Sequence, residues 1–392
     1  MLSLIHCSDV HLDTPMTLSE FRRQDASFAE VRAVFSSMMQ YIRQNHIPLL
    51  LIAGDLFNNA LVSKETISFL KREFSEIPDC QIVIAPGADD ACTPHSPYLT
   101  EAFPENVHIF RSAEVTRVSL PALHTDVYGF ARCPGEELPG ASPLSGFSVS
   151  DRSAYNIFCA YTALASDPGH GTDEPAPLVS KEQLVHAGFD YAALGSQHNA
   201  GSLRRAVSAG NGNTGASVSY FAYSGCLAGR NFSEPGCKSA IRASIEKNPG
   251  ETASLQVGRL RFSRRHFETL EIDCSSFGNL RQISDAAAAE AEKAGCDKET
   301  VLRLVLTGST PPSVLPNEKN LRPLLPHFAE LHIEDKTVPD AEAEQLSADP
   351  TLRGAFYAEL LPLMEGGSEE EKETARLALR LGLAALSGSD TE

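Results

Sequence analysis

Short, continuous runs of apolar residues alternate with amphipathic stretches over the first two-thirds of the chain. The apolar runs span residues 3–7, 47–53, 81–85, 127–131, 156–161, 191–194 and 220–223. Apolar side chains recur at the spacing of a helix with one buried face in two of the intervening stretches. One, from Phe28 to Ile42, lies between the first and second runs, and the other begins after Ser63, between the second and third. Continuous apolar strands separated by helices predict an α/β fold whose sheet is covered on both faces.

The pattern restarts near residue 266. An apolar strand is expected at 266–272, an Ala-rich helix at 279–294 and another strand at 301–307. A chain of this length usually fills more than one core. We therefore expect two domains, a large one at residues 1–265 and a small α+β one at 266–392.

The second domain ends in a predicted helical tail. Ser368 and Glu371 have the spacing of a capping box at the start of a helix. The face expected to be buried carries Leu377, Leu381 and Ala384 or Ala385. Elsewhere, two Gly-rich segments, 166–177 and 199–217, are expected to be loops.

Composition adds limits on location and chemistry. The chain is 42% hydrophobic and 21% charged, which is ordinary for a globular protein. No apolar run approaches the roughly 18 residues of a membrane helix, and the first residues lack the features of a signal peptide, so we predict a cytoplasmic protein without a membrane span. The nine cysteines include no C-x-x-C pair, which favours buried, reduced thiols over a zinc ribbon or a redox motif.

The net charge of −18 bears on partners. Affinity for DNA comes largely from Lys and Arg side chains that neutralise phosphates, so an acidic chain repels a duplex unless its basic residues gather locally. Two such clusters exist, Arg204 with Arg205, and Arg259, Arg261, Arg264 with Arg265. Ordinary solvated surface charge is the simpler interpretation of both clusters.

Candidate metal ligands follow three of the predicted strands. Asp9 and His11 come after the first strand, Asp55 follows Gly54 after the second, and His198 comes after the strand at 191–194. In an extended chain, residues two apart point the same way, so Asp9 and His11 can reach one ion. Sites in open α/β sheets form at the carboxyl ends of strands. Two carboxylates and two imidazoles form a suitable ligand set for manganese, iron or zinc.

The order of these segments and their amino-acid sequences resemble the motifs of the calcineurin-like metallophosphoesterases. Within that superfamily they are most similar to the DNA repair exonuclease subunits of the SbcD and YhaO type. The resemblance rests on the sequences LIHCSDVHLD at 4–13, AGDLF at 53–57, FDYAALG at 189–195, YSG at 223–225 and FSEPG at 232–236. It extends over about residues 1–275, and more loosely over the strand–helix–strand unit beyond.

The resemblance implies a four-layer β-sandwich flanked by helices, with two divalent ions that serve phosphodiester hydrolysis, and a small capping domain. It also implies a coiled-coil ATPase partner of the SbcC type, and it makes DNA and a second copy of the chain candidate partners. The ligands of the first metal correspond to Asp9, His11, Asp55 and His198, and all four are present.

The ligands of the second metal are mostly missing. The positions of the family's Asn and of two of its His residues correspond to Ala88, Tyr161 and Ser196. The usual His-Asp pair of the third motif falls on Asp89 and Asp90, and either carboxylate can take the place of a lost ligand. His170 is a further candidate substitute. One divalent ion per chain is therefore expected.

Three functions remain open at this stage. The first is a nuclease-fold protein with one metal and weak or lost nuclease activity, which acts as a partner subunit of an SbcC-like ATPase. The second is an active phosphodiesterase whose two-metal site is rearranged around Asp89, Asp90 and His170. The third is an interaction module without metal, which the acidic charge and the tail helix favour.

Overall fold

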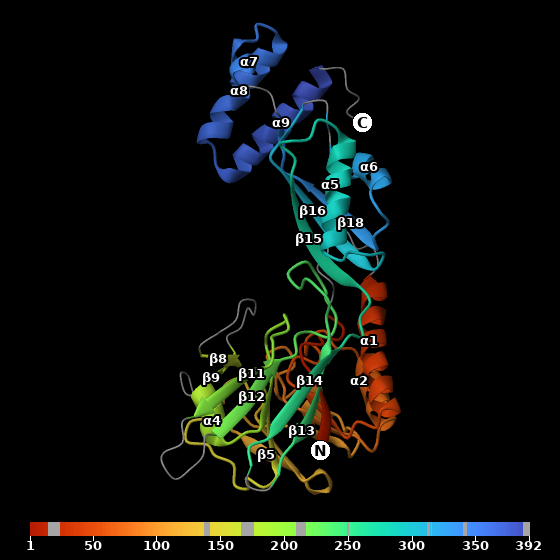
Figure 1. Cartoon of the computed structure of the whole chain (residues 1–392), viewed down its shortest axis with the longest axis vertical. Coiled ribbons are helices and arrows are strands. Elements are labelled where there is room, and N and C mark those ends of the chain that lie inside the picture. Colours follow the sequence, from red (N-terminus) through yellow and green to blue (C-terminus); the bar gives the residue numbers. More distant parts are fainter. Residues whose placement is uncertain are drawn as a thin grey trace. The chain divides into compact units, whose positions relative to one another are not determined.

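The computed structural model describes residues 1–14, 24–136, 142–165, 176–208, 217–248, 251–311, 314, 316–339 and 343–386 (Figure 1). The chain divides into two compact units, Met1–Arg264 and Arg265–Glu392. Among the described residues, no helix is both long and apolar enough to cross a membrane.

The first unit is built on two mixed six-stranded sheets. In one sheet the strand order is β14 (Ser254–Leu260), β13 (Ala240–Glu246), β1 (Leu2–Cys7), β2 (Leu49–Ile52), β3 (Gln81–Ile84), β4 (Val107–Ile109). In the other it is β11 (Arg204–Ser208), β12 (Ser217–Tyr223), β10 (Tyr191–Gly195), β7 (Tyr155–Tyr161), β6 (Thr125–Gly129), β5 (Thr116–Leu120). The central strands of both sheets are parallel, which explains why they are apolar throughout.

Helices cover the outer faces of this sandwich. The helices α1 (Gln24–Gln44) and α2 (Lys64–Ser75) pack on the first sheet through Phe35, Leu70 and Phe74. Alternate residues of β7 divide between two cores: Ile157 faces the first sheet, whereas Phe158 faces the core that includes α4 (Lys181–Ala187). The layers are therefore helix, sheet, sheet and helix, and the predicted α/β sandwich is confirmed.

The smaller elements of this unit are α3 (Pro97–Thr100), the 3-10 turn η1 (Pro121–Leu123), β8 (Ala163–Leu164) and β9 (Leu178–Val179). Part of the predicted loop at 199–217 is wrong, because Arg204–Ser208 forms the edge strand β11. Only Ala206 of that strand is buried, so its sequence lacks the apolar run by which the central strands were recognised. Residues 166–175 and 209–216 of the two predicted loops lie outside the described part of the chain.

The second unit contains a three-stranded parallel sheet, β15 (His266–Asp273), β16 (Thr300–Thr307) and β18 (Glu330–Asp335). The helix α5 (Leu280–Lys293) joins β15 to β16 and packs on the sheet through Ile283, Ala287 and Ala291. The remaining elements are β17 (Ser309–Thr310), α6 (Glu318–Leu321), η2 (Arg322–Leu324), β19 (Val338–Pro339), α7 (Ala343–Ala348), α8 (Leu352–Gly366) and α9 (Glu369–Leu386).

The tail helix α9 begins at the predicted capping box. The Ser368 N–H donates to the Glu371 carboxylate at 2.8 Å, and the Glu371 N–H donates to the Ser368 hydroxyl at 3.3 Å. The predicted buried face is wrong, because Leu377 and Leu381 are 58% and 47% exposed. The face that packs beside α8 carries Ala375, Leu379 and Leu383 instead. Both rows have the same spacing, so the sequence pattern alone did not distinguish them.

The two sheets of the first unit come into close backbone contact where β2 and β10 end. A methyl group added at Gly195 would lie 1.6 Å from the carbonyl oxygen of Ala53. Only glycine therefore fits between the two strand ends that position Asp55 and His198.

We expect Gly195→Ala to lower the free energy of unfolding by roughly 2–3 kcal/mol, because the methyl group forces the two backbones apart. Gly258→Ala in β14 is the matched control, since a methyl group there meets nothing within 4 Å. Urea unfolding of both variants measures the difference. Equal stability of the two variants would contradict this account of the sheet contact.

Candidate metal centre

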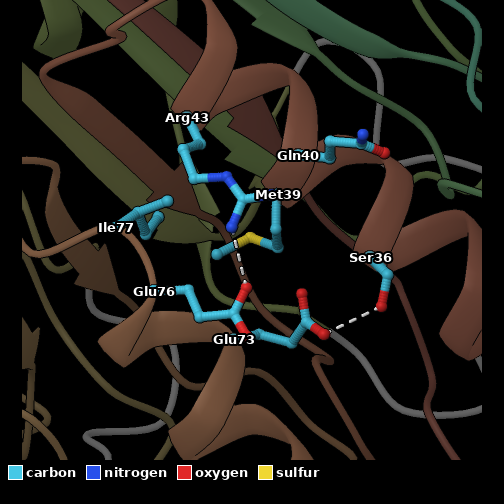
Figure 2. Close-up of a pocket in the computed structure, with 7 residues that line it drawn as sticks. All are labelled: Ser36, Met39, Gln40, Arg43, Glu73, Glu76 and Ile77. Carbon is cyan, nitrogen blue, oxygen red and sulfur yellow. Dashed lines mark hydrogen bonds and ion pairs between the residues drawn. The ribbon is translucent and has the colours of Figure 1, made fainter.

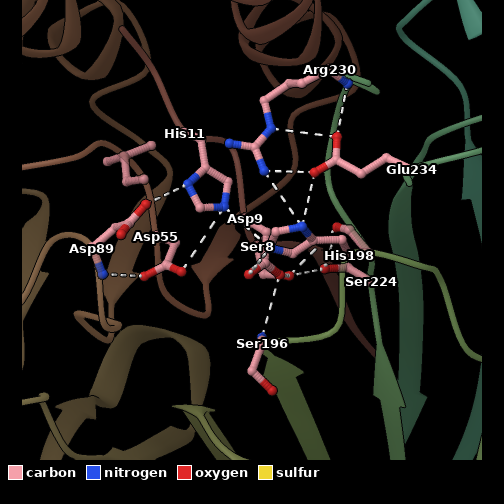
Figure 3. Close-up of polar contacts among 12 residues, drawn as sticks. Ser8, Asp9, His11, Asp55, Asp89, Ser196, His198, Ser224, Arg230 and Glu234 are labelled. Atoms are coloured by element: carbon pink, nitrogen blue, oxygen red, sulfur yellow. Dashed lines mark hydrogen bonds and ion pairs between the residues drawn. The ribbon is translucent and has the colours of Figure 1, made fainter. Parts of the chain in front are cut away.

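The predicted ligands converge at the carboxyl ends of parallel strands (Figure 3). Asp9 and His11 follow β1, Asp55 follows β2 and His198 follows β10. Donor atoms of Asp9, His11 and His198 all lie within 4.8 Å of one another. Those of His11, Asp55 and Asp89 do the same, so His11 belongs to both groups.

The backbone that carries these ligands is left-handed. The φ angles of Asp9, His11 and Asp55 are 50°, 49° and 53°. The extended conformation assumed from the D-x-H spacing is therefore wrong, although both side chains reach the same site. Two hydrogen bonds lock the turns together, from the Asp9 N–H to the Gly54 carbonyl and from the His11 N–H to the Asp55 carbonyl, each at 2.9 Å. A non-glycine residue with φ in this range carries backbone strain of about 1–3 kcal/mol, and residues with such strain are concentrated at functional sites.

The donor atoms are spaced like ligands of one ion. His11 Nε2 lies 3.3 Å from His198 Nε2 and 3.9 Å from Asp55 Oδ2. His198 Nε2 lies 3.8 Å from Asp9 Oδ1. Ligands bonded at about 2.1 Å to one ion stand roughly 3–3.5 Å apart, so Asp9, His11 and His198 need only a small adjustment to share one, and Asp55 lies beside them through His11.

Charge and hydrogen bonding in the site also fit a cation. Asp9 Oδ1 is fully buried and has no hydrogen-bond partner among the described residues. Burial raises the pKa of Asp55 well above its usual value, and the neighbouring carboxylates of Asp90, Asp9 and Asp89 raise it further. A divalent cation would relieve this concentration of negative charge.

A carboxylate braces each histidine on the side away from the shared donor atoms. Asp89 Oδ2 lies 3.0 Å from Nδ1 of His11, and Glu234 Oε1 lies 2.8 Å from Nδ1 of His198. A proton held at each Nδ1 leaves Nε2 as the lone-pair donor, which is the tautomer that a metal requires. Two such lone pairs facing each other at 3.3 Å repel one another unless a cation lies between them.

Glu234 is itself buried and paired with Arg230. Burial would raise the pKa of Glu234, but hydrogen bonds and charge from His198 and Arg230 hold it well below its usual range. The same Glu234 carboxylate raises the pKa of His198 against the lowering effect of burial. Sequence reasoning did not identify Arg230 and Glu234 as functional residues. They lie in a loop segment that resembled the family, and no strand end marked them.

The positions that the resemblance assigns to a second metal, Ala88, Tyr161 and Ser196, belong to neither group of donors found among the described residues. Ala88 has no donor atom. The ring of Tyr161 packs so closely that a methyl group added at Gly54 would lie 2.5 Å from it, and one added at Gly87 2.7 Å. The Ser196 hydroxyl turns away from the ligands and donates to the Thr162 carbonyl at 3.0 Å.

The three candidate substitute ligands, Asp89, Asp90 and His170, differ in their surroundings. Asp89 braces His11 and also belongs to the group formed with Asp55, whose Oδ1 accepts the Asp89 N–H at 2.9 Å. Both oxygens of Asp90 are occupied by donors of the surrounding loops: the N–H groups of Asp55, Leu56 and Gly87, and the Tyr98 hydroxyl. His170 lies outside the described residues.

Part of the second predicted basic cluster is engaged within the fold. The Arg259 guanidinium donates to the carbonyl oxygens of Ser224 and Gly201. That of Arg261 donates to the carbonyl oxygens of Ser263 and Arg264. These two arginines therefore hold loops in place, and less of their charge is available for phosphates than the sequence indicated.

A pocket of about 260 Å³ lies between α1 and α2 (Figure 2). Ser36 donates to Glu73, and Arg43 pairs with Glu76 across it. None of the residues that line it belongs to the metal-ligand groups. We therefore attribute the pocket to the packing of the two helices.

Residues 2–136 match the family model of the calcineurin-like phosphoesterases, which agrees with the sandwich and with the candidate metal ligands at its strand ends. Over most of its length the chain is also similar to an uncharacterized metallophosphoesterase, YhaO of Bacillus subtilis strain 168. The two are 27% identical over 403 aligned positions, which cover 93% of this chain and 90% of the relative. The resemblance to the calcineurin-like metallophosphoesterases and to YhaO is therefore confirmed, whereas the resemblance to DNA repair exonucleases stays a prediction.

We expect Glu234→Gln to weaken the binding of Mn²⁺ about 10- to 100-fold, because the neutral amide orients and polarises His198 less well than the carboxylate does. Isothermal titration calorimetry measures the affinity. Glu246→Gln, at an exposed position of β13, is the control and should bind as the wild type does. Unchanged affinity in Glu234→Gln would show that this brace does not support the metal.

Asp90→Ala should lower the free energy of unfolding by roughly 3 kcal/mol or more, because it leaves buried donors without an acceptor. Asp89→Ala, one residue away and partly exposed, should cost less than half as much. Urea unfolding without added metal separates the two effects. Equal losses would argue against a structural part for Asp90.

Proposed function

We propose that this protein is a phosphoesterase-fold, SbcD/YhaO-like subunit that holds one divalent ion per chain and has weak or no nuclease activity. The observation that carries the proposal is a contrast within one site. Donors of Asp9, His11 and His198 converge, Asp55 lies beside His11, and both imidazoles are braced by carboxylates. Of the positions that the resemblance assigns to a second metal, Ala88 has no donor atom, Ser196 donates to Thr162, and the ring of Tyr161 packs against Gly54 and Gly87.

Asp9, His11, Asp55 and His198 would hold the divalent ion, which when bound would supply Lewis-acid chemistry toward a phosphoryl oxygen. The chain's own residues prepare for this. Asp89 and Glu234 keep the protons of the two imidazoles at Nδ1. Tyr161 fills the space beside Gly54 and Gly87, where the family places further ligands. Mixed nitrogen and oxygen donors suit manganese, iron or zinc.

The expected loss of nuclease activity follows from the incomplete ligand set. Two-metal phosphoesterases stabilise both the attacking and the leaving oxygen, and one set of ligands can serve only one of these tasks. A structural or regulatory role beside an SbcC-like ATPase, with DNA or a second copy of the chain as further partners, rests on the resemblance to the family. These partners and the cytoplasmic location stay predictions.

An active phosphodiesterase with a rearranged second site is the second candidate. It is favoured by the cluster of His11, Asp55 and Asp89, whose donor atoms lie within 4.8 Å of one another. In that arrangement Asp89 exchanges its bond to His11 for a second ion. The two candidates differ in the number of ions bound.

Metal content decides between them. We expect about one manganese per chain by elemental mass spectrometry, in protein purified without chelator, incubated with Mn²⁺ and desalted. His198→Ala should lose this ion because it removes a ligand, whereas Ser196→Ala should retain it because the Ser196 hydroxyl bonds to Thr162. Two ions per chain in the wild type would favour the rearranged site, and no ion would refute both candidates.

Restoring the missing ligands provides the converse test. Ala88→Asn, Tyr161→His and Ser196→His together should raise the metal content towards two ions and increase Mn²⁺-dependent cleavage of linear duplex DNA. Robust exonuclease activity in the wild type, abolished by Asp9→Ala, would overturn the proposed loss of activity.

A further inference from the structure

We propose that Arg230 binds the phosphate group of the ligand at this metal centre and supplies positive charge where the second ion is missing. The inference rests on the proposed function, since it concerns the same site. It assigns to Arg230, which is not a metal ligand, a role in positioning and selecting the bound ligand.

Glu234 holds the Arg230 guanidinium in a fixed orientation. Arg230 Nη2 donates to Glu234 Oε1 at 2.6 Å, and Nε donates to Oε2 at 3.4 Å. The Arg230 backbone N–H donates to Oε2 of the same carboxylate at 2.7 Å. The side chains of Arg230 and Glu234 are only 9% and 2% exposed, so this fork is nearly desolvated and pre-organised.

The third guanidinium nitrogen is not used by the fold. Arg230 Nη1 has no hydrogen-bond partner among the described residues, and it is not among the fully buried unpaired atoms. In Figure 3 this nitrogen turns away from Glu234 toward the side of His11.

The charge balance of the site favours an anion-binding role. Four carboxylates surround the two histidines, those of Asp9, Asp55, Asp89 and Glu234. One divalent ion and no further cation would leave a phosphate facing net negative charge. A guanidinium directed at the site reduces this repulsion and offers hydrogen bonds that match phosphate oxygens.

Neutralising Glu234 does not account for the whole arrangement. That carboxylate is satisfied by Nε, Nη2 and the backbone N–H of Arg230 together with His198. Nη1 is additional to this need and faces the ligands. Lysine keeps the charge beside Glu234 but has no second terminal nitrogen, so Arg230→Lys separates the two roles.

The test uses the full chain loaded with Mn²⁺ and inorganic phosphate as the probe. Bound Mn²⁺ broadens the ³¹P resonance of phosphate that binds nearby, so a titration gives the phosphate affinity. We expect Arg230→Lys to weaken phosphate binding at least tenfold while its Mn²⁺ affinity stays within about threefold of the wild type. Arg242→Lys, an exposed arginine of β13, is the matched control and should change neither quantity.

Each outcome decides between explanations. Equal phosphate affinity in wild type and Arg230→Lys would overturn the inference and leave the metal site intact. Loss of Mn²⁺ affinity in Arg230→Lys would also overturn it, because Arg230 would then act only through Glu234 and His198. Absence of bound Mn²⁺ in the wild type would instead refute the proposed function. Should Arg230→Lys not fold, the double variant Arg230→Gln with Glu234→Gln is compared with Glu234→Gln alone, both saturated with Mn²⁺, and weaker phosphate binding in the double variant is expected.

Discussion

The two hydrogen bonds between the turns after β1 and β2 are the constraint on which the site depends. They join Asp9 to Gly54 and His11 to Asp55 and hold three ligands in the left-handed conformation. No regular strand would place these side chains together, since the chain has left the sheet when it reaches them. The sheet brings the ends of the parallel strands together, and the paired turns orient the side chains of Asp9, His11 and Asp55. Strain in the turns is maintained because the sandwich around them is rigid and fully packed.

The second organising feature is the set of acidic side chains around the two histidines. Asp89 and Glu234 orient the imidazoles, Asp9 and Asp55 face the space between them, and Arg230 offsets part of the charge. Carboxylates buried so close together are the arrangement that a bound cation would stabilise. The neighbouring residues Asp89 and Asp90 have different roles. Asp90 accepts hydrogen bonds from four donors of the surrounding loops, whereas Asp89 contacts His11.

The ring of Tyr161 occupies space at a position that the resemblance assigns to the second metal. An aromatic ring packed against Gly54 and Gly87 fills the volume beside Asp55, so the change goes beyond a missing donor. Ser196 adjusts in the same sense by bonding to Thr162. These contacts support the proposal of one divalent ion per chain. An alternative use of Asp89 keeps the second candidate function open, since its carboxylate lies within reach of Asp55 as well as of His11.

The sequence by itself determined the α/β class and the strand ends after which Asp9, His11, Asp55 and His198 lie, because apolar runs and short motifs are local signals, and the resemblance to the family supplied the sandwich. It did not reveal the edge strand β11, whose single buried residue leaves no apolar run, nor the buried face of α9, because two leucine rows share one spacing. Only the tertiary structure decided that Asp90 is structural and that Arg230 and Glu234 support His198. Those roles depend on contacts between segments far apart in the chain, and no local pattern encodes such distances.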